Sequence, residues 1–344
     1  MSYSPPFQLT HTMIRLVSDI SQQIGKWTAS EDKLFPELRK ENRIRTIQAS
    51  LAVEQNTLSL EQVTALINGK TVLGSPKEIQ EVHNAFSAYE NLDRWSEVDG
   101  DHLLEAHGYM MRGLILDAGQ WRNGGAGIYR GDKLVHMAPP ANQVPRLMIQ
   151  LLGWLRDTDA HPLIASAAFH YEFEFIHPFS DGNGRMGRFW QTLILSKWNS
   201  MLSYLPVETV IKAKQNEYYS ALREADSKCD CTAFIEFLLS SMNEALNEAI
   251  QVGAKMRVEK PLKTTEMRVE TQVEMRVEKP LKTTDQILLM LEEDPTLTLS
   301  ELSARIGRVK STVERAVGKL KKEGRLEFRG PKKGGRWVVL SQRK

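Results

Sequence analysis

The chain has 344 residues, more than one hydrophobic core usually serves, so we expect more than one folding unit. Apolar residues make up 41% and charged residues 26%, the balance of an ordinary soluble globular protein that can build a core. No apolar run reaches the roughly eighteen residues that span a bilayer, and the N-terminus lacks a signal-peptide pattern. We therefore expect no membrane partner and a cytoplasmic location, with Cys229 and Cys231 as reduced bystanders.

Residues 8–75 read as helices with little strand signal, because apolar residues recur at helical spacing around Ile47. One helix is predicted to end near Glu54. A second begins within residues 58–61, where Ser59 can act as its N-terminal cap.

Residues 75–119 continue the helical pattern, and His107 within them is interpreted as a surface or packing residue. From 119 to 148, glycines, alternating apolar residues and a Pro-Pro pair predict a short β-hairpin between helices. Helical pattern resumes at 144–156 and at 162–175. The second of these helices delivers the chain to the most informative segment.

Residues 176–188 read IHPFSDGNGRMGR and combine residue types that suit a nucleotide phosphate. The imidazole of His177 is of a type that accepts protons near neutral pH. The carboxylate of Asp181 is a hard oxygen ligand of the kind that Mg²⁺ prefers beside phosphates. Gly182 and Gly184 let the backbone approach an anion and point N–H groups at it.

Helix-favouring residues follow, so the loop is predicted to open a helix whose N-terminus favours negative charge. Arg185 and Arg188 lie one turn apart and can clamp the same ligand. We therefore interpret the segment as an anion-binding loop with a base at its mouth.

The same string matches the Fic family signature, H-x-F-x-D/E-G-N-G-R-x-x-R, at every specified position. The chain thus resembles enzymes that transfer AMP from ATP to a hydroxyl side chain of a protein. The resemblance implies a mainly α fold, a Fic-type helical bundle with a short β-hairpin flap. It also implies ATP as substrate, Mg²⁺ as cofactor, and a target protein with a Ser, Thr or Tyr hydroxyl as partner, the chain itself included.

By this resemblance, His177 would activate the hydroxyl and Asp181 would hold Mg²⁺. The residues implied in nucleotide binding are Gly182, Asn183 and Gly184 around the α-phosphate, Arg185 on the β-phosphate, Arg188 on the γ-phosphate and Tyr219 toward the adenine. The predicted hairpin, with Val135 and His136, resembles the flap that holds the target segment as an added strand.

Ser50 and Glu54 resemble the inhibitory motif S/T-x-x-x-E-G/N that precedes the core in one class of the family. In that class the Glu pairs with the second arginine of the core motif, here Arg188, and blocks the γ-phosphate. One carboxylate and one triphosphate cannot share a single guanidinium fork. Gln55 stands where Gly or Asn is expected, which leaves the geometry and tightness of inhibition open.

Composition changes after Ala249, and the decapeptide MRVEKPLKTT occurs at 256–265 and again at 275–284. With little apolar content, it predicts an extended or partly ordered duplicated linker. The expected organisation is an N-terminal helical region with the inhibitory motif at 1–110, a catalytic core at 111–248, the linker at 249–284 and a last domain at 285–344.

The last domain reads as three helices followed by two strands around a basic Gly-rich tip, which resembles a winged helix-turn-helix. From Arg305 onward, fourteen Lys and Arg stand against three Glu, the charge pattern of phosphate-backbone binding. DNA is therefore an expected partner, with a protein-binding or dimerising module as the alternative. The candidate contacts are Lys310, Arg315 and Lys319 in the recognition helix and Lys332, Lys333 and Arg336 in the wing.

The sequence thus favours a protein adenylyltransferase restrained by Glu54 and joined to a winged helix, and we also expect a homodimer. A DNA-binding transcriptional regulator with a nucleotide-sensing Fic domain is the first alternative. His177 favours the enzyme, because a pure sensor needs no base beside the phosphates. Removal of AMP from a modified protein would use the same residues and remains open, whereas Arg188 disfavours phosphoryl transfer.

Overall fold

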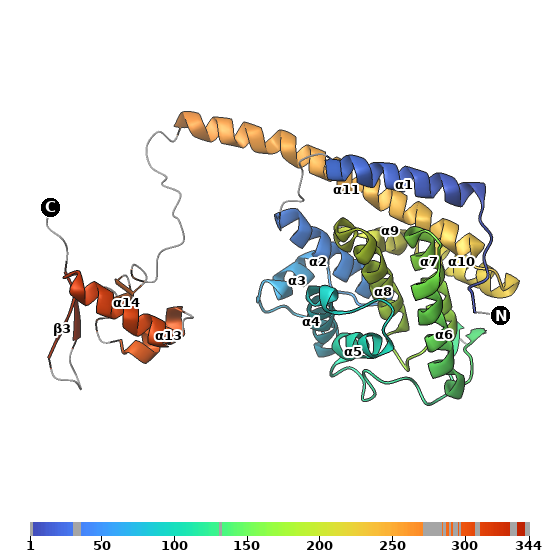
Figure 1. Cartoon of the computed structure of the whole chain (residues 1–344), viewed down its shortest axis with the longest axis horizontal. Coiled ribbons are helices and arrows are strands. Elements are labelled where there is room, and N and C mark those ends of the chain that lie inside the picture. The colour runs from blue at the N-terminus through green and yellow to red at the C-terminus, as the bar shows by residue number, and fades with distance from the viewer. Residues whose placement is uncertain are drawn as a thin grey trace. The chain divides into compact units, whose positions relative to one another are not determined.

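The computed structural model describes residues 3–29, 36–130, 133–270, 297–306, 310–330 and 336–340, together with residues 284, 287, 288, 290, 291 and 295. The chain divides into two compact units, Met1–Pro261 and Leu262–Lys344. Helices dominate both units, as Figure 1 shows, which confirms the predicted mainly α fold.

The first unit is a helical bundle with one β-hairpin. Its α-helices are α1 (His11–Ala29), α2 (Pro36–Val53), α3 (Leu60–Ile67), α4 (Pro76–Glu90), α5 (Gly100–Met111), α6 (Val144–Asp157), α7 (Pro162–Ile176), α8 (Asn183–Trp198), α9 (Val207–Ala213), α10 (Gln215–Lys228) and most of α11 (Thr232–Glu270). Short 3-10 helices are η1 (Leu92–Arg94), η2 (Ala141–Gln143) and η3 (Ser200–Tyr204).

Helix α7 is the centre of this unit, because its sequence is apolar on nearly every face and a helix of that kind is buried on all sides. Leu163 and Ala167 join the core that α7 forms with α1, α10 and α11. Phe169 and Phe173 join a second core with α2 to α6 and α8. The end of α7 is therefore held firmly from both sides.

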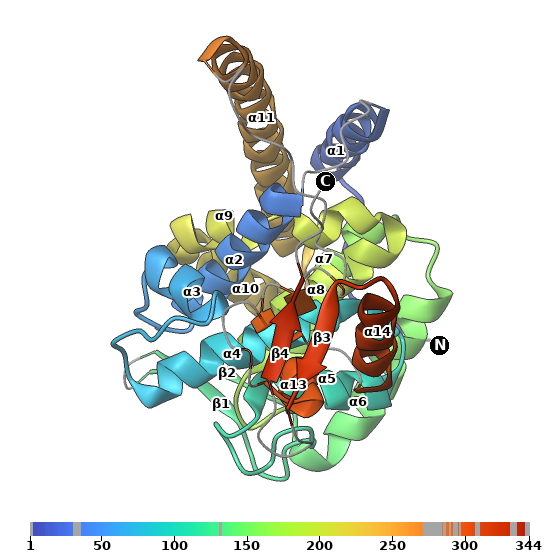
Figure 2. The same ribbon diagram turned by 90° about the vertical axis from the view of Figure 1, so that its left-hand side faces the viewer.

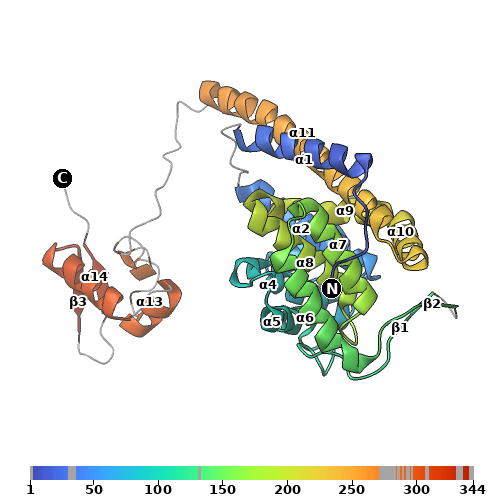
Figure 3. The same ribbon diagram turned by 45° about the vertical axis from the view of Figure 1, so that its right-hand side comes forward.

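Helix α1 lies alongside α11, as Figures 1 and 3 show. The Gln23 side chain donates to Asn243 over 2.9 Å, and the Thr10 hydroxyl donates to the Glu236 carboxylate over 2.5 Å. The N-terminal segment thereby closes the core over α7 and α11.

The turn between α2 and α3 confirms the predicted helix boundary. Ser59 caps α3 by accepting from the backbone N–H of Gln62, whose side chain bonds back to Ser59. This reciprocal capping box satisfies two N–H groups that the first turn of a helix leaves without partners.

The predicted hairpin is confirmed as β1 (Gly127–Arg130) paired antiparallel with β2 (Lys133–Met137). A further hydrogen bond of 3.1 Å from Ala138 N to Ala126 O closes its base. Figure 3 shows the hairpin projecting from the helical body near α6.

The linker, which the sequence predicts to be extended or partly ordered, is helical over residues 256–270, where it continues α11. This stretch contains three Glu and two each of Met, Arg and Lys, which favour helix, and Pro261 does not end it. The second copy of the decapeptide lies outside the described residues except for residue 284. None of the described helices is long and apolar enough to cross a membrane.

The second unit contains α13 (Leu299–Ile306) and α14 (Lys310–Lys322), followed by β3 (Leu326–Arg329) and β4 (Arg336–Val339). The two strands pair antiparallel and lie beside α14 (Figure 2). Trp337 joins the small core, and its indole N–H donates to Leu297 O over 3.1 Å. The order of these elements matches the second and third helices and the two strands of the predicted winged helix, while most of the first predicted helix lies outside the described residues.

Candidate active site

The loop between α7 and α8 carries the motif and is held open by two left-handed residues. His177 ends α7 with φ 51°, and Gly182 has φ 86° immediately before α8 begins at Asn183. A side chain at Gly182 would also meet the Met111 sulfur at 2.6 Å. Glycine is required there for both conformation and space.

Asn183 fastens this loop rather than facing a ligand. Its side-chain oxygen accepts from Phe179 N over 2.9 Å, and its side-chain nitrogen donates to Phe179 O over 2.9 Å. Phe179 itself is fully buried and stacks between His107, at a centroid distance of 3.6 Å, and Trp121, at 5.3 Å. The Asn183 side chain therefore fixes the shape of the loop.

His107 contacts the motif loop, which the sequence did not reveal. Gly119 N donates to its Nδ1 over 2.9 Å, and its Nε2 lies 3.0 Å from Asp181 O. Burial lowers the pKa of His107 to about 4, so the ring is neutral near pH 7. Since Nδ1 accepts a bond, Nε2 carries the proton and donates it to the Asp181 carbonyl.

The two motif arginines have different surroundings. Arg185 is 5% exposed, and its guanidinium contacts Glu81 at 3.3 Å and Asp181 at 3.1 Å. Arg188 is 2% exposed and reaches α2 instead. Glu81 is a partner that sequence reasoning missed, because it lies on α4, far away in the chain.

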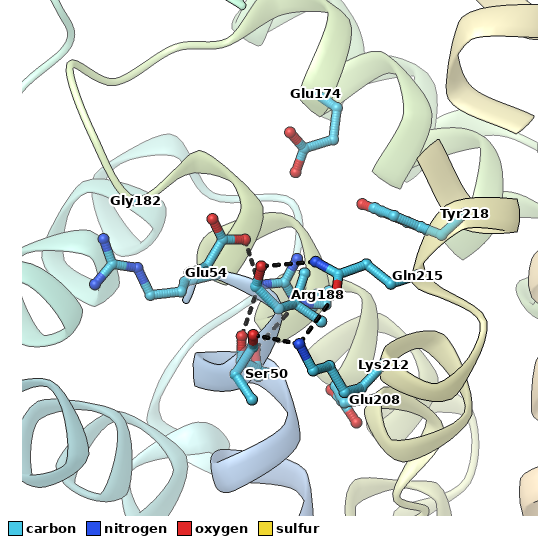
Figure 4. Close-up of polar contacts among 12 residues, drawn as sticks. Ser50, Glu54, Glu174, Gly182, Arg188, Glu208, Lys212, Gln215 and Tyr218 are labelled. Atoms are coloured by element: carbon cyan, nitrogen blue, oxygen red, sulfur yellow. Dashed lines mark hydrogen bonds and ion pairs between the residues drawn. The ribbon is translucent and has the colours of Figure 1, made fainter. Parts of the chain in front are cut away.

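The predicted pairing of Glu54 with Arg188 is present (Figure 4). Arg188 NH2 donates to Glu54 Oε1 over 2.7 Å and to Ser50 O over 3.0 Å, while its Nε donates to the Ser50 hydroxyl over 3.0 Å. Burial alone would lower the pKa of Arg188, but the Glu54 carboxylate raises it above the ordinary value. The guanidinium therefore stays charged and is held by α2.

Gly184 makes room for this pair. A Cβ at Gly184 would lie 2.3 Å from Glu54 Oε1, which is too close, and 3.1 Å from Arg188 NH1, which is a tight contact. The Glu54 carboxylate thus lies directly against the first turn of α8. This is the position in which a helix N-terminus favours an anion.

Helix α2 ends in a Schellman turn with Gln55 at its left-handed position. Asn56 N donates to Leu51 O over 3.1 Å, Gln55 N donates to Ala52 O over 3.3 Å, and Gln55 has φ 71°. Gly or Asn adopts this conformation more readily than Gln. The departure noted in the sequence is therefore accommodated at a cost in backbone strain.

Two side chains from the α9–α10 region hold the end of α2 in place (Figure 4). Lys212 Nζ donates to Ala52 O over 2.7 Å, and Gln215 Nε2 donates to Val53 O over 3.0 Å. Both acceptors belong to the last turn, where carbonyls have no partner within the helix and a positive charge is favourable. The end of α2 is thus held through both its side chains and its backbone.

A cavity of about 510 Å³ brings most of these groups together. Of the residues predicted for the site, those that line it are Glu54, His177, Gly184, Arg188 and Tyr219. Sequence reasoning named no role for the further lining residues Tyr171, Glu174, Gln215, Asn216 and Arg223. They come from helices α7 and α10. No local sequence pattern predicts that these two helices lie next to each other.

Glu174 is a buried acid in the wall of this cavity. Its Oε1 has no hydrogen-bond partner within the described part of the chain. Burial raises its pKa to about 8, against the lowering effect of Arg188 and with a further rise from Glu54. Glu174 is therefore largely neutral at pH 7, and the negative partner of Arg188 is Glu54.

Asp181 fits a cation that phosphate oxygens would also bind. Its side chain is half-exposed, and one oxygen accepts from Gly182 N over 2.6 Å. Among the described residues, no cluster of three or more His, Cys, Asp or Glu side chains could hold a metal. Mg²⁺ commonly binds through one or two carboxylates plus substrate phosphates, which suits this arrangement.

The remaining predicted residues lie on the hairpin and in the second unit. Val135 and His136 belong to β2, but their side chains lie outside the described residues, as do those of Lys310 and Arg336. Lys332 and Lys333 lie outside them entirely. Arg315 and Lys319 are exposed on α14, whose opposite face is buried through residues such as Val313.

Comparison with known proteins agrees with this geometry. Residues 97–195 match the Fic/DOC family, and residues 281–327 match the winged helix-turn-helix DNA-binding family. A solved Fic family protein from Desulfovibrio desulfuricans G20 is 44% identical, with 99% of this chain and 100% of that one covered and a TM-score of 0.70. The chain belongs to the Fic family.

Curated relatives of this Fic protein carry adenylyltransferase names. Protein adenylyltransferase Fic of Culex quinquefasciatus is 28% identical over 240 residues, covering 66% of this chain and 45% of that protein. Protein adenylyltransferase fic-1 of Caenorhabditis briggsae is 27% identical over 271 residues, covering 74% and 51%. The chain spans about half the length of these relatives. Fic-1 from C. elegans shares the fold, with a TM-score of 0.58 at 23% identity over 71% of this chain and 72% of that one.

The strained turn of the Fic core leads to a first prediction. Gln55→Gly should raise the unfolding free energy by roughly 1 kcal/mol, because glycine adopts the left-handed conformation without the Cβ penalty. Gln80→Gly, inside α4, should lower it by roughly 1 kcal/mol instead. Urea unfolding of both variants checks this, and a destabilised Gln55→Gly protein would contradict it.

A second prediction concerns Glu174 and pH. Between its ordinary pKa of 4.5 and its folded value of about 8, the unfolded chain ionises this group while the folded chain does not. The free energy of unfolding therefore falls by about 1.4 kcal/mol for each pH unit in that window. Above the folded pKa it falls no further on account of this group. Glu174→Gln removes this loss, so its stability advantage over wild type should grow as pH rises from about 5 to about 8.

The measurement is the urea-unfolding free energy of wild type and Glu174→Gln across that range. Glu217→Gln, which alters an exposed carboxyl on the neighbouring helix α10, is the matched control. An advantage of Glu174→Gln that stays constant with pH would show that Glu174 is ionised in the folded chain.

Proposed function

We propose that this Fic protein is a protein adenylyltransferase that moves AMP from ATP to a Ser, Thr or Tyr hydroxyl of a protein, and that Glu54 restrains it. The observation that carries the proposal is that His177, Gly184 and Arg188 line one cavity at the N-terminus of α8. Its volume of about 510 Å³ falls within the range typical of small-molecule sites.

The phosphates would lie against the first turn of α8, where backbone N–H groups and the helix dipole favour anions. Arg188 would take the γ-phosphate once Glu54 leaves, and Arg185 the β-phosphate beside Asp181. Asp181 would hold Mg²⁺, which when bound neutralises part of the phosphate charge. Tyr219, which is half-buried in the same cavity, would lie beside the adenine.

The chemical step we propose is an in-line displacement at the α-phosphorus. The acceptor hydroxyl gives its proton to the His177 imidazole as its oxygen bonds to the phosphorus. The bond to the oxygen that bridges the α- and β-phosphates breaks, and diphosphate leaves with its charge held by the arginines. The β1–β2 hairpin would present the hydroxyl by taking the target segment as an added strand.

Restraint follows from competition for one guanidinium. Glu54 and Ser50 hold Arg188 through charge-assisted bonds, and Glu54 lies where a phosphate would approach Gly184. Lys212 and Gln215 fix the end of α2 and so oppose its withdrawal. Removing AMP from a modified protein would use these same groups with water as the acceptor, and it is an outcome of the test below.

The decisive experiment is intact-protein mass after incubation with ATP and Mg²⁺. We expect Glu54→Gly to gain AMP roughly ten- to a hundredfold faster than wild type, because one charge-assisted bond to Arg188 is lost. Adding His177→Ala should slow that gain by at least about a hundredfold, while ATP binding persists.

Glu41→Gly is the matched control for the release by Glu54→Gly. It places glycine in the same helix but removes only an exposed ion pair with Arg45. If Glu41→Gly activated as strongly as Glu54→Gly, weakening of α2 rather than release of Arg188 would be the cause. If no variant gained AMP, yet the wild type with Glu54 and His177 intact removed AMP from a modified protein, the reverse reaction would be the activity.

A second proposed function is DNA binding by the winged helix. It is supported by the family match at 281–327 and by the exposed Arg315 and Lys319 on α14. The other side of the same helix packs in the small core through Val313, Val317 and Leu320, so the basic side faces outward.

We expect the full chain to bind duplex DNA with an affinity that falls steeply with salt. Replacing both Arg315 and Lys319 with Ala should lower the slope of log affinity against log salt by about two, roughly one for each lost phosphate contact. Lys77→Ala, at an exposed position on α4, is the control. Fluorescence anisotropy at several salt concentrations measures this, and equal slopes would exclude α14 as the contact.

A further inference from the structure

Arg122 lies between α5 and β1, is 4% exposed, and belongs to neither the cavity nor the motif. Its Nε donates to His177 O over 2.6 Å, and its NH2 donates to Ile176 O over 3.3 Å. A guanidinium carries five N–H groups in a rigid plane, so one side chain can reach acceptors on several sides.

The same guanidinium holds both stems of the hairpin. NH1 donates to Gly124 O over 2.8 Å, just before β1, and NH2 donates to Pro139 O over 2.5 Å, just after β2. Between them, the hydrogen bond from Ala138 to Ala126 closes the base of the hairpin. Arg122 therefore links the two ends of the flap to each other and to the end of α7.

The backbone at His177 needs such support. Its φ of 51° is unfavourable for a residue with a side chain. Arg122 bonds to three consecutive carbonyls there, since its own backbone N–H also donates to Pro178 O over 3.0 Å. A positive charge beside carbonyls at a helix C-terminus is favourable.

We propose that Arg122 is a positioning residue for transfer, holding the hairpin and the backbone of His177 as one unit so that a hydroxyl presented by the hairpin meets the imidazole. This inference rests on the proposed function. Its physical basis is that proton abstraction requires hydrogen-bond reach, and a misplacement of about 1 Å can lower a rate about a hundredfold.

Lysine cannot replace this arrangement. Its ammonium is a single point with three donors, whereas the acceptors lie on the motif loop and on both hairpin stems. Arg122→Lys keeps the charge and loses the spread of donors. Arg122→Gln loses both. Comparing the two variants therefore separates the effect of the charge from that of the donor geometry.

The test uses the full chain in the Glu54→Gly background. For Arg122→Lys and Arg122→Gln, we expect the rate of AMP transfer at saturating ATP to fall about a hundredfold, with the dissociation constant for ATP changed less than about threefold. Arg146→Lys is the control, because Arg146 bonds only to the side chains of Gln143 and Gln150 among the described residues. An undiminished rate, or equal loss of ATP binding, would overturn the proposal.

Hydrogen exchange supplies a readout that needs no activity. In the Arg122 variants, backbone amides of the hairpin stems and of residues 176–186, from the end of α7 to the first turn of α8, should lose protection from exchange together. Amides of α4 should keep theirs. If the parent transfers no AMP, the proposed function fails, yet this joint loss would still support a shared anchor. Unchanged protection in either segment would overturn it, as would failure of both variants to fold, since Arg122 would then be a general structural residue.

Discussion

The charge on Arg188 is buried to 2% exposure, and a charge so placed requires hydrogen bonds and a negative partner. Ser50 in α2 accepts two hydrogen bonds from Arg188, and Glu54, directly after α2, accepts a third and supplies the negative charge. Glu174, the other carboxyl nearby, is kept largely neutral by burial. The position of α2 on the Fic core is therefore tied to the state of one guanidinium.

The motif loop that leads to Arg188 is held in place by contacts with neighbouring helices. Asn183 fixes the loop to Phe179, and the stacking of Phe179 on His107 fixes it to α5. Glu81 holds Arg185 from α4. The motif residues are thus positioned mainly by buried contacts with α4 and α5.

Much of this could be predicted from the sequence where the cause is local. The helix boundary at Ser59, the hairpin, and the opening of α8 after Gly182 follow from residues within a few positions of each other. The Glu54 pairing was predictable only through the family resemblance, since Glu54 and Arg188 lie 134 residues apart. The roles assigned to the phosphate-binding residues stay predictions.

What the sequence did not reveal depends on distant contacts or on overridden preferences. His107 reads as an ordinary packing residue until α5 is placed against the motif loop. The side chain of Asn183 suits a phosphate by type, yet both its polar atoms are committed to Phe179. The first copy of the decapeptide looked like a connector, but its helix-favouring residues extend α11 past Pro261.

Gln215 belongs to two structures at once, since it lines the cavity and also bonds to Val53 O at the end of α2. A ligand that draws Gln215 toward itself weakens its bond to α2, and anything that draws α2 away leaves Gln215 to the ligand. Thermodynamic linkage makes the two effects equal in size. A partner protein that binds α2 in its displaced form would therefore tighten the affinity of the cavity for nucleotide without touching it.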